Sequence, residues 1–123
     1  MAKILTVDDS AFMRKVLSDI LTKNGHSVIE AENGVQALEV YTEQKPDLVL
    51  LDIIMPEEDG ISVLKKITPL GAKAIIISAV GQDDMIQQAK TSGALDYIVK
   101  PFEETAVIAT INKYLGVNTT TIV

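Results

Sequence analysis

Five short apolar runs divide the chain, and each is followed by a segment in which apolar residues recur at helical spacing. The runs at 48–51 and 74–78 are continuous rather than alternating, a pattern typical of strands that are buried on both faces of a parallel sheet. The run at 27–31 is the weakest, which favours an edge position for it. The expected strands cover 4–7, 27–31, 48–51, 74–78 and 95–99, and the expected helices begin near 10, 34, 61, 82 and 103.

The regular alternation of strands and helices defines the fold class. Short connections between five strand–helix pairs imply a parallel sheet with helices on both faces. We therefore expect an α/β fold, a flavodoxin-like (βα)5 doubly wound sheet with strand order 2-1-3-4-5, because the first, third and fourth strands are the most apolar. No linker or change of composition divides the sequence, so we expect a single domain over 1–123. The Thr-rich segment 116–123 has no assignment.

Local signals suggest how the first two helices begin and which side chains they bury. Asp9 or Ser10 can cap the first helix, because a short polar side chain accepts a hydrogen bond from a free backbone N–H group there. Phe12 and Val35 count among the apolar positions of the first and second helices. His26 has no second metal ligand nearby in the sequence, so we expect it at the surface.

The composition excludes several classes of function. A formal charge of −6 and the lack of a Lys/Arg cluster argue against binding to the phosphate backbone of nucleic acids. The chain has no cysteine, hence no disulfide, thiolate metal site or cysteine nucleophile. The amino terminus carries no signal-peptide pattern and no apolar run approaches membrane-spanning length. We therefore expect a small soluble cytoplasmic protein without membrane insertion.

Three aspartates follow two strands that we expect to be neighbours. Asp8 and Asp9 follow the first strand and Asp52 ends the third, at the point where the strand order reverses and open α/β sheets place their binding sites. Two unit charges about 4 Å apart repel by roughly 4 kcal/mol at an effective dielectric of about 20, so three acids together favour a bound cation. The donor set favours Mg²⁺. The alternative is that Asp9 caps a helix and the other two are solvated acids.

A hydroxyl and an ammonium group follow the fourth and fifth strands at the same edge. Ser78 and Lys100 would supply hydrogen-bond donors and positive charge to the oxygens of a phosphoryl group. Asp52 would then be the nucleophile that forms an acyl phosphate. Singly, each residue has a simpler explanation, since Ser78 can cap a loop and Lys100 can neutralise a neighbouring acid. The convergence of four strand ends favours phosphoryl chemistry.

Together these residues resemble the receiver domain of two-component response regulators, over essentially the whole chain. The opening of the first helix, at 8–14, is most similar to the stand-alone chemotaxis type of receiver, and we expect no output domain. The motifs that carry the resemblance are Asp8-Asp9, Asp52 with Met55-Pro56 and Gly60, Ser78-Ala79, and Lys100-Pro101-Phe102.

The resemblance implies a role for each residue of the acidic site. It implies one Mg²⁺, held directly by Asp9, Asp52 and the backbone carbonyl of Ile54, with Asp8 acting mainly through water. The peptide bond before Pro101 is expected to be cis, which the weak trans preference of X–Pro bonds permits. The other implied roles are Asp52 as phosphoacceptor, Ser78 as switch hydroxyl, Lys100 as phosphate-binding lysine and Tyr97 as aromatic switch.

The implied function is signalling rather than enzymatic turnover. A histidine kinase of the chemotaxis type would phosphorylate Asp52, and the chain would catalyse only its own phosphotransfer and the slow hydrolysis of its acyl phosphate. The phosphorylated form would bind an output protein, such as a flagellar motor switch protein or an archaeal adaptor. We expect a monomer, and the motifs specify neither the kinase nor the output partner.

Alternatives stay open from the sequence. One is a stand-alone receiver in a phosphorelay outside chemotaxis. Another is a small-molecule phosphatase of the aspartyl-phosphate type, which also uses Asp, Ser, Lys and Mg²⁺ but usually carries its nucleophile after the first strand and needs a cap domain. A flavin-binding flavodoxin has the same architecture, but Asp8-Asp9 would repel the phosphate of the flavin.

Overall fold

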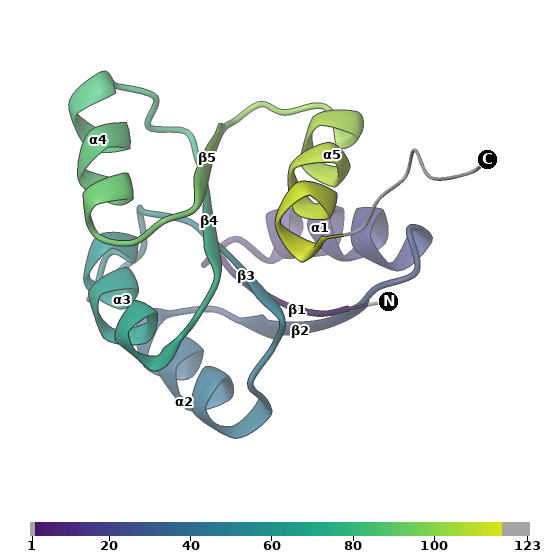
Figure 1. The fold of residues 1–123 in the computed structure, drawn as a ribbon, viewed down its shortest axis with the longest axis horizontal. Coiled ribbons are helices and arrows are strands. Elements are labelled where there is room, and N and C mark those ends of the chain that lie inside the picture. The colour runs from purple at the N-terminus through teal and green to yellow at the C-terminus, as the bar shows by residue number, and fades with distance from the viewer. Residues whose placement is uncertain (1, 117–123) are drawn as a thin grey trace.

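The backbone forms a five-stranded parallel sheet between two layers of helices (Figure 1). The computed structural model describes residues 2–116, so residues 117–123 of the Thr-rich segment lie outside the described residues. The strands are β1 (Lys3–Val7), β2 (Ser27–Ala31), β3 (Leu48–Leu51), β4 (Ala74–Ser78) and β5 (Asp96–Val99). Their order is β2-β1-β3-β4-β5 and every neighbouring pair is parallel, which confirms the expected fold class and strand order.

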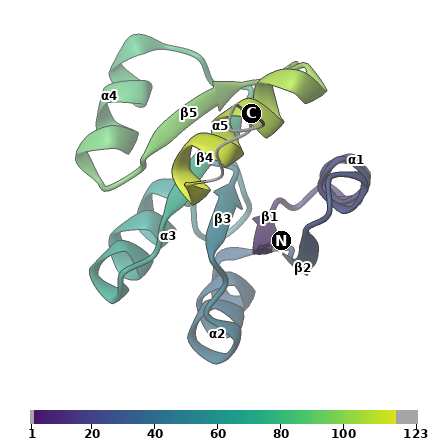
Figure 2. The same cartoon turned by 45° about the vertical axis from the view of Figure 1, so that its right-hand side comes forward.

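The helices connect the strands and cover both faces of the sheet. They are α1 (Ala11–Lys23), α2 (Gly34–Gln44), α3 (Gly60–Ile67), α4 (Asp83–Thr91) and α5 (Glu104–Leu115). Helices α2, α3 and α4 lie on one face, and α1 and α5 lie on the other (Figure 1 and Figure 2). A short 3-10 helix, η1 (Thr68–Leu70), follows α3 and was not expected from the sequence. None of the helices in the described part of the chain is long and apolar enough to span a bilayer.

Two apolar layers fill the space between the sheet and its helices. Successive side chains of a strand point to opposite faces. Leu48 and Leu50 of β3 therefore pack with the side chains of α1 and α5, while Val49 and Leu51 pack with those of α2, α3 and α4. All four residues of β3 are buried, as the continuous apolar run predicted. This central strand holds the next residue, Asp52, at the carboxyl edge of the sheet.

Side-chain caps fix where three of the helices begin. The Ser10 hydroxyl accepts a hydrogen bond from the backbone N–H of Met13 (3.1 Å), so Ser10, and not Asp9, caps α1. Asn33 and Asp59 cap α2 and α3 in the same way. Because Asp9 is not used as a cap, its carboxylate stays available to the acidic site.

Three side chains lie where the sequence did not predict them. Phe12 and Val35 are 75% and 62% exposed, although we expected them on the apolar faces of α1 and α2. At 3.6 residues per turn, Phe12 lies roughly 140° around the helix from the buried Leu17, so it points away from the sheet. His26 is buried rather than at the surface. Its ring Nδ1 accepts a hydrogen bond from the backbone N–H of Ala2 (3.2 Å), a partner 24 residues away.

Candidate functional site

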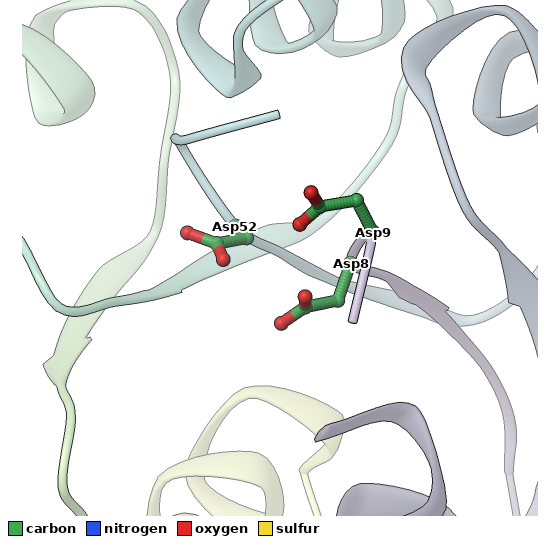
Figure 3. Close-up of side chains that lie close together, drawn as sticks. All are labelled: Asp8, Asp9 and Asp52. Atoms are coloured by element: carbon green, nitrogen blue, oxygen red, sulfur yellow. The ribbon is translucent and has the colours of Figure 1, made fainter. Parts of the chain in front are cut away.

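Three carboxylates converge at the carboxyl edge of the sheet, where the strand order reverses between β1 and β3. Asp8 and Asp9 directly follow β1, and Asp52 directly follows β3. One oxygen from each carboxylate lies within 4.8 Å of the other two, and Figure 3 shows the three side chains grouped together. The Asp52 backbone N–H donates to the Val7 carbonyl (3.0 Å), so the pairing of the two strands sets this spacing. The structure thus brings together the three acids that the sequence placed at two strand ends.

The three acids differ in how firmly they are held. Asp8 is 3% exposed, and its Oδ1 accepts a hydrogen bond from the Ser10 N–H (2.9 Å). Asp52 is 8% exposed, and its Oδ1 accepts a hydrogen bond from the Ile54 N–H (3.2 Å). Asp9 is exposed, and within residues 2–116 its side chain makes no hydrogen bond or ion pair. Two acids are therefore fixed in place, and the third is open to a ligand.

The ammonium group of Lys100 is the positive charge inside this cluster. Its Nζ donates to Asp8 Oδ2 (2.9 Å) and to Asp52 Oδ2 (3.1 Å). Burial disfavours the charged ammonium, but the hydrogen bonds and charges of the two carboxylates outweigh burial and raise the pKa of Lys100 above its ordinary value. Lys100 is therefore charged throughout the neutral range. The peptide bond between Lys100 and Pro101 is cis, as the resemblance implied.

The charges and donor atoms of the cluster fit a divalent cation. Three carboxylates carry three negative charges and Lys100 contributes one positive charge, which leaves two negative charges in a partly buried site. Carboxylate and carbonyl oxygens are the ligands that Mg²⁺ prefers, and a few of them suffice because the ion keeps several waters. An acidic pocket that can hold one metal ion is therefore present. The carbonyl of Ile54 as a ligand stays a prediction.

A glycine allows the loop between β3 and α3 to approach the backbone of Asp52 closely. A Cβ atom at Gly60 would lie 2.2 Å from the Asp52 carbonyl oxygen, so no side chain fits at this position. The Gly60 N–H donates to the Ile53 carbonyl (2.8 Å), which closes the loop. The side chain of Ile54, two residues after Asp52, is 59% exposed. The glycine of the family motif thus has a steric reason in this structure.

Ser78 and Tyr97 lie on the neighbouring strands β4 and β5 and contact the same residue. Ser78 is buried, and its hydroxyl accepts a hydrogen bond from the Val80 N–H (3.3 Å). The half-buried Tyr97 donates its hydroxyl to the carbonyl of Val80. Burial raises the pKa of the Tyr97 phenol, while the nearby Ser78 hydroxyl counteracts this shift and the charge of Asp52 adds to it. Both side chains therefore contact the loop after β4, and their roles in switching stay predictions.

One charged side chain of this region was not singled out from the sequence. Arg14 belongs to the motif at 8–14, but its contacts appear only in the structure. Its Nη1 donates to the Asp8 carbonyl (2.6 Å) and its Nε to Glu30 Oε1 (2.9 Å). No periodicity could have indicated this, because Glu30 is 16 residues away and the contact with Asp8 is to the backbone.

Comparisons with known proteins place this geometry among related chains. The family model described as the response regulator receiver domain matches residues 4–112. The chain is 55% identical to the chemotaxis protein CheY of Bacillus subtilis (strain 168) over 117 residues, which cover 93% of this chain and 98% of that protein. It is 49% identical to CheY of Thermotoga maritima over 114 residues, 90% of this chain and 95% of that protein.

A solved structure is similar in both sequence and fold. The CheX–CheY–BeF3–Mg²⁺ complex from Borrelia burgdorferi contains a chain that matches with a TM-score of 0.87 and 35% sequence identity. The match covers 90% of this chain and 87% of that chain. The similarity therefore extends over most of the fold, and the family model spans the four strand ends that form the acidic site.

Proposed function

The chain belongs to the response regulator receiver domain family, and we propose that it is a chemotaxis regulator of the CheY type that is controlled by phosphorylation of Asp52. The observation that carries the proposal is the contact of the Lys100 ammonium with both Asp8 and Asp52 in a cluster of three carboxylates. This arrangement offers a nucleophilic oxygen, a site for a divalent ion and a positive charge at one place. We further propose that the chain acts as a single receiver domain.

The residues of the acidic site are proposed to hold one Mg²⁺, which when bound neutralises charge on the phosphoryl oxygens. Asp9 is exposed and unpaired within residues 2–116, so it is suited to direct ligation, together with Asp52 and the Ile54 carbonyl. Asp8 is the most deeply buried of the three acids, at 3% exposed, and is proposed to act through water. The related complex from Borrelia burgdorferi contains Mg²⁺, which supports this choice of ion.

Asp52 is proposed to be the phosphoacceptor. One of its carboxylate oxygens forms the new O–P bond while the N–P bond of a phosphohistidine breaks and the imidazole leaves with the electron pair. Lys100 exchanges its hydrogen bond with Asp52 Oδ2 for one with a phosphoryl oxygen, and the Ser78 hydroxyl donates to another. The chain contributes positioning and electrostatic stabilisation, and its activity is limited to this transfer and to slow hydrolysis of the acyl phosphate.

The phosphoryl group is proposed to change partner binding through the loop after β4. When the Ser78 hydroxyl turns to a phosphoryl oxygen, it gives up its hydrogen bond with Val80, the residue that Tyr97 also contacts. Helix α4 follows this loop and is weakly anchored. No side chain caps its beginning, and within its described range only one residue, Ala89, is buried. A shift between existing positions of α4 would alter the surface formed by α4, β5 and α5.

The proposed partners follow from this role. A histidine kinase of the CheA type donates the phosphoryl group, and a flagellar motor switch protein or an archaeal adaptor reads the phosphorylated surface. In the Borrelia burgdorferi structure a CheY is bound to CheX, and we propose a CheX-like protein as a further partner. The chain itself is proposed to be a monomer that binds no nucleic acid.

The proposal is tested by intact mass after incubation with acetyl phosphate and Mg²⁺. We expect the wild-type chain to gain one phosphoryl group and Asp52→Asn to gain none, because the amide is not a nucleophile. Asp19→Asn is the matched control, since Asp19 pairs with Lys15 on the exposed face of α1, and it should gain one phosphoryl group. A chelator of divalent ions should abolish the gain of a phosphoryl group in both the wild type and Asp19→Asn.

No gain in the wild type, or an equal gain in Asp52→Asn, would refute the assignment of the phosphoacceptor. Repeated turnover of a chromogenic phosphate ester would instead favour a small-molecule phosphatase. A flavin absorbance spectrum of the purified chain would favour a flavodoxin. Neither of these two classes is supported by the family match.

A further inference from the structure

The guanidinium group of Arg14 joins three segments of the chain at one side of the acidic site. Its Nη1 donates to the carbonyl oxygen of Asp8, after β1 (2.6 Å), and its Nε donates to Glu30 Oε1 in β2 (2.9 Å). Its Nη2 lies 3.8 Å from Glu32 Oε2, just after β2. The Arg14 side chain is 14% exposed, whereas the side chains of Glu30 and Glu32 are 45% and 58% exposed. A planar group that is held from several sides has a fixed orientation.

Asp8 is held through all of its polar groups. Its N–H donates to the Ala31 carbonyl (3.2 Å), and its two carboxylate oxygens accept hydrogen bonds from the Ser10 N–H and from Lys100 (2.9 Å each). The remaining group is the carbonyl oxygen of Asp8, and Arg14 donates to it. The contact with Arg14 is therefore the one that fixes the peptide group leading from Asp8 to the next residue.

That next residue is Asp9, whose side chain makes no hydrogen bond within the described range 2–116. Because a peptide group is planar, fixing its oxygen sets the direction in which the chain enters Asp9. We propose that Arg14 is a positioning residue: by holding the Asp8 carbonyl, it directs the carboxylate of Asp9 toward the divalent cation that Asp9 shares with Asp52. This inference rests on the proposed function, which supplies the cation.

A purely electrostatic role for Arg14 would have the opposite effect on metal binding. A positive charge near the site repels Mg²⁺, so its removal would strengthen binding. Positioning instead predicts weaker binding when Arg14 is replaced, because the Asp9 carboxylate then has to be ordered by the ion itself. The sign of the change in Mg²⁺ affinity therefore distinguishes the two explanations.

The test is the affinity of the full chain for Mg²⁺, measured by titration calorimetry on wild type and three variants. We expect Arg14→Gln to raise the dissociation constant about tenfold. Lys15→Gln is the control: it removes the same charge from the next residue of α1, whose ammonium pairs with the exposed Asp19 (2.8 Å). We expect it to change the dissociation constant for Mg²⁺ less than about twofold. Arg14→Lys keeps the charge but loses the fork that reaches both partners, so it should also weaken binding, by about threefold.

A second readout separates positioning from a general loosening of the fold. The rate at which acetyl phosphate phosphorylates Asp52 is measured over a range of Mg²⁺ concentrations. We expect Arg14→Gln to raise the half-saturating Mg²⁺ concentration about tenfold and to leave the rate at saturating Mg²⁺ within about twofold of wild type. A loosened fold would lower the saturated rate as well.

The inference would be overturned if Arg14→Gln bound Mg²⁺ as tightly as Lys15→Gln, or more tightly. If circular dichroism shows that Arg14→Gln does not fold, Arg14→Lys provides the test, and wild-type affinity in that variant is the overturning result. A wild-type chain that binds no Mg²⁺ would refute the proposed function, and the inference with it.

Discussion

The hydroxyl of Thr6 lies in the interior of the sheet without a hydrogen-bond partner, the one buried side-chain polar atom of this kind among the described residues. Thr6 pairs with Leu50 of β3 and Glu30 of β2 and, by the alternation of β1, it points to the face that α1 and α5 cover. An unpaired buried hydroxyl costs about 1–3 kcal/mol, and valine has nearly the same shape without it. The residue is therefore a weak point of the core.

We expect Thr6→Val to raise the free energy of unfolding by about 1 kcal/mol, because the unpaired hydroxyl is removed and the shape is kept. Urea unfolding measures the change. Thr68→Val is the matched control, since the Thr68 hydroxyl contacts the carbonyls of Leu64 (2.8 Å) and Ser92 (3.3 Å), and it should lower the stability by about 1 kcal/mol. A less stable Thr6→Val would indicate that the hydroxyl has a partner, such as a buried water.

Individual residues, inside and outside the site, differ in how well the sequence reveals their positions and contacts. Asp52 and Ser78 could be located because each ends an apolar run, and parallel strands place their carboxyl ends at one edge. Arg14 and His26 could not, because their partners are backbone atoms or acids far away in the sequence. Contacts of this kind follow from the three-dimensional arrangement and leave no periodic pattern. Metal ligation and switching by the predicted residues stay predictions.

At the scale of elements, α2 ends at a residue with a strained backbone. Lys45 follows the helix with φ 46° and ψ 62°, the left-handed conformation, and its N–H donates to the Tyr41 carbonyl (2.9 Å). For a residue with a Cβ atom this conformation costs roughly 1–2 kcal/mol, whereas glycine adopts it freely. Pro46 follows, so the helix cannot continue.

Lys45→Gly is expected to stabilise the chain by about 1 kcal/mol, because it relieves this strain and keeps the closing hydrogen bond. The same substitution at Lys65, on the exposed face of α3, should destabilise by about 1 kcal/mol, since there glycine only weakens a helix. Thermal unfolding of both variants gives the comparison. An equal loss of stability in Lys45→Gly and Lys65→Gly would mean that the backbone of Lys45 is not strained.

Element positions were predicted better than the side chains they bury. The bounds 27–31 and 74–78 agree with β2 and β4, because turn residues and apolar content change sharply at both ends of these runs. The 3-10 helix η1 was missed, since its three residues are too few to show a period. Phe12 and Val35 were misplaced because apolar character alone does not say which face of the first helical turn meets the sheet.

At the scale of the whole molecule, His26 lies at the edge of the sheet opposite the acidic site, between the beginnings of β1 and β2. The Ala2 N–H donates to its Nδ1, so this nitrogen has to be unprotonated. Burial lowers the pKa of His26 below its ordinary value. Because the unfolded chain then binds the proton more tightly, the contribution of His26 to stability is complete above about pH 6.5 and is lost as the pH falls through the folded-state pKa.

We expect the free energy of unfolding to decrease from pH 7.5 to pH 5.5 by more in the wild type than in His26→Gln. The chain contains one histidine, so the difference between the two proteins isolates this group. Urea unfolding at the two pH values measures it. A decrease of equal size in both proteins would show that His26 does not titrate with folding.

The contacts of Lys100 also bear on whether the chain needs a bound ion in order to fold. Because its ammonium compensates Asp8 and Asp52 from within the protein, folding needs no external ion to relieve their repulsion. An ion that binds only the folded chain adds stability by mass action, about 1.4 kcal/mol at a free concentration tenfold above its dissociation constant. We therefore expect the chain to fold before it binds the proposed Mg²⁺, so that the amount of folded protein changes little with the magnesium concentration.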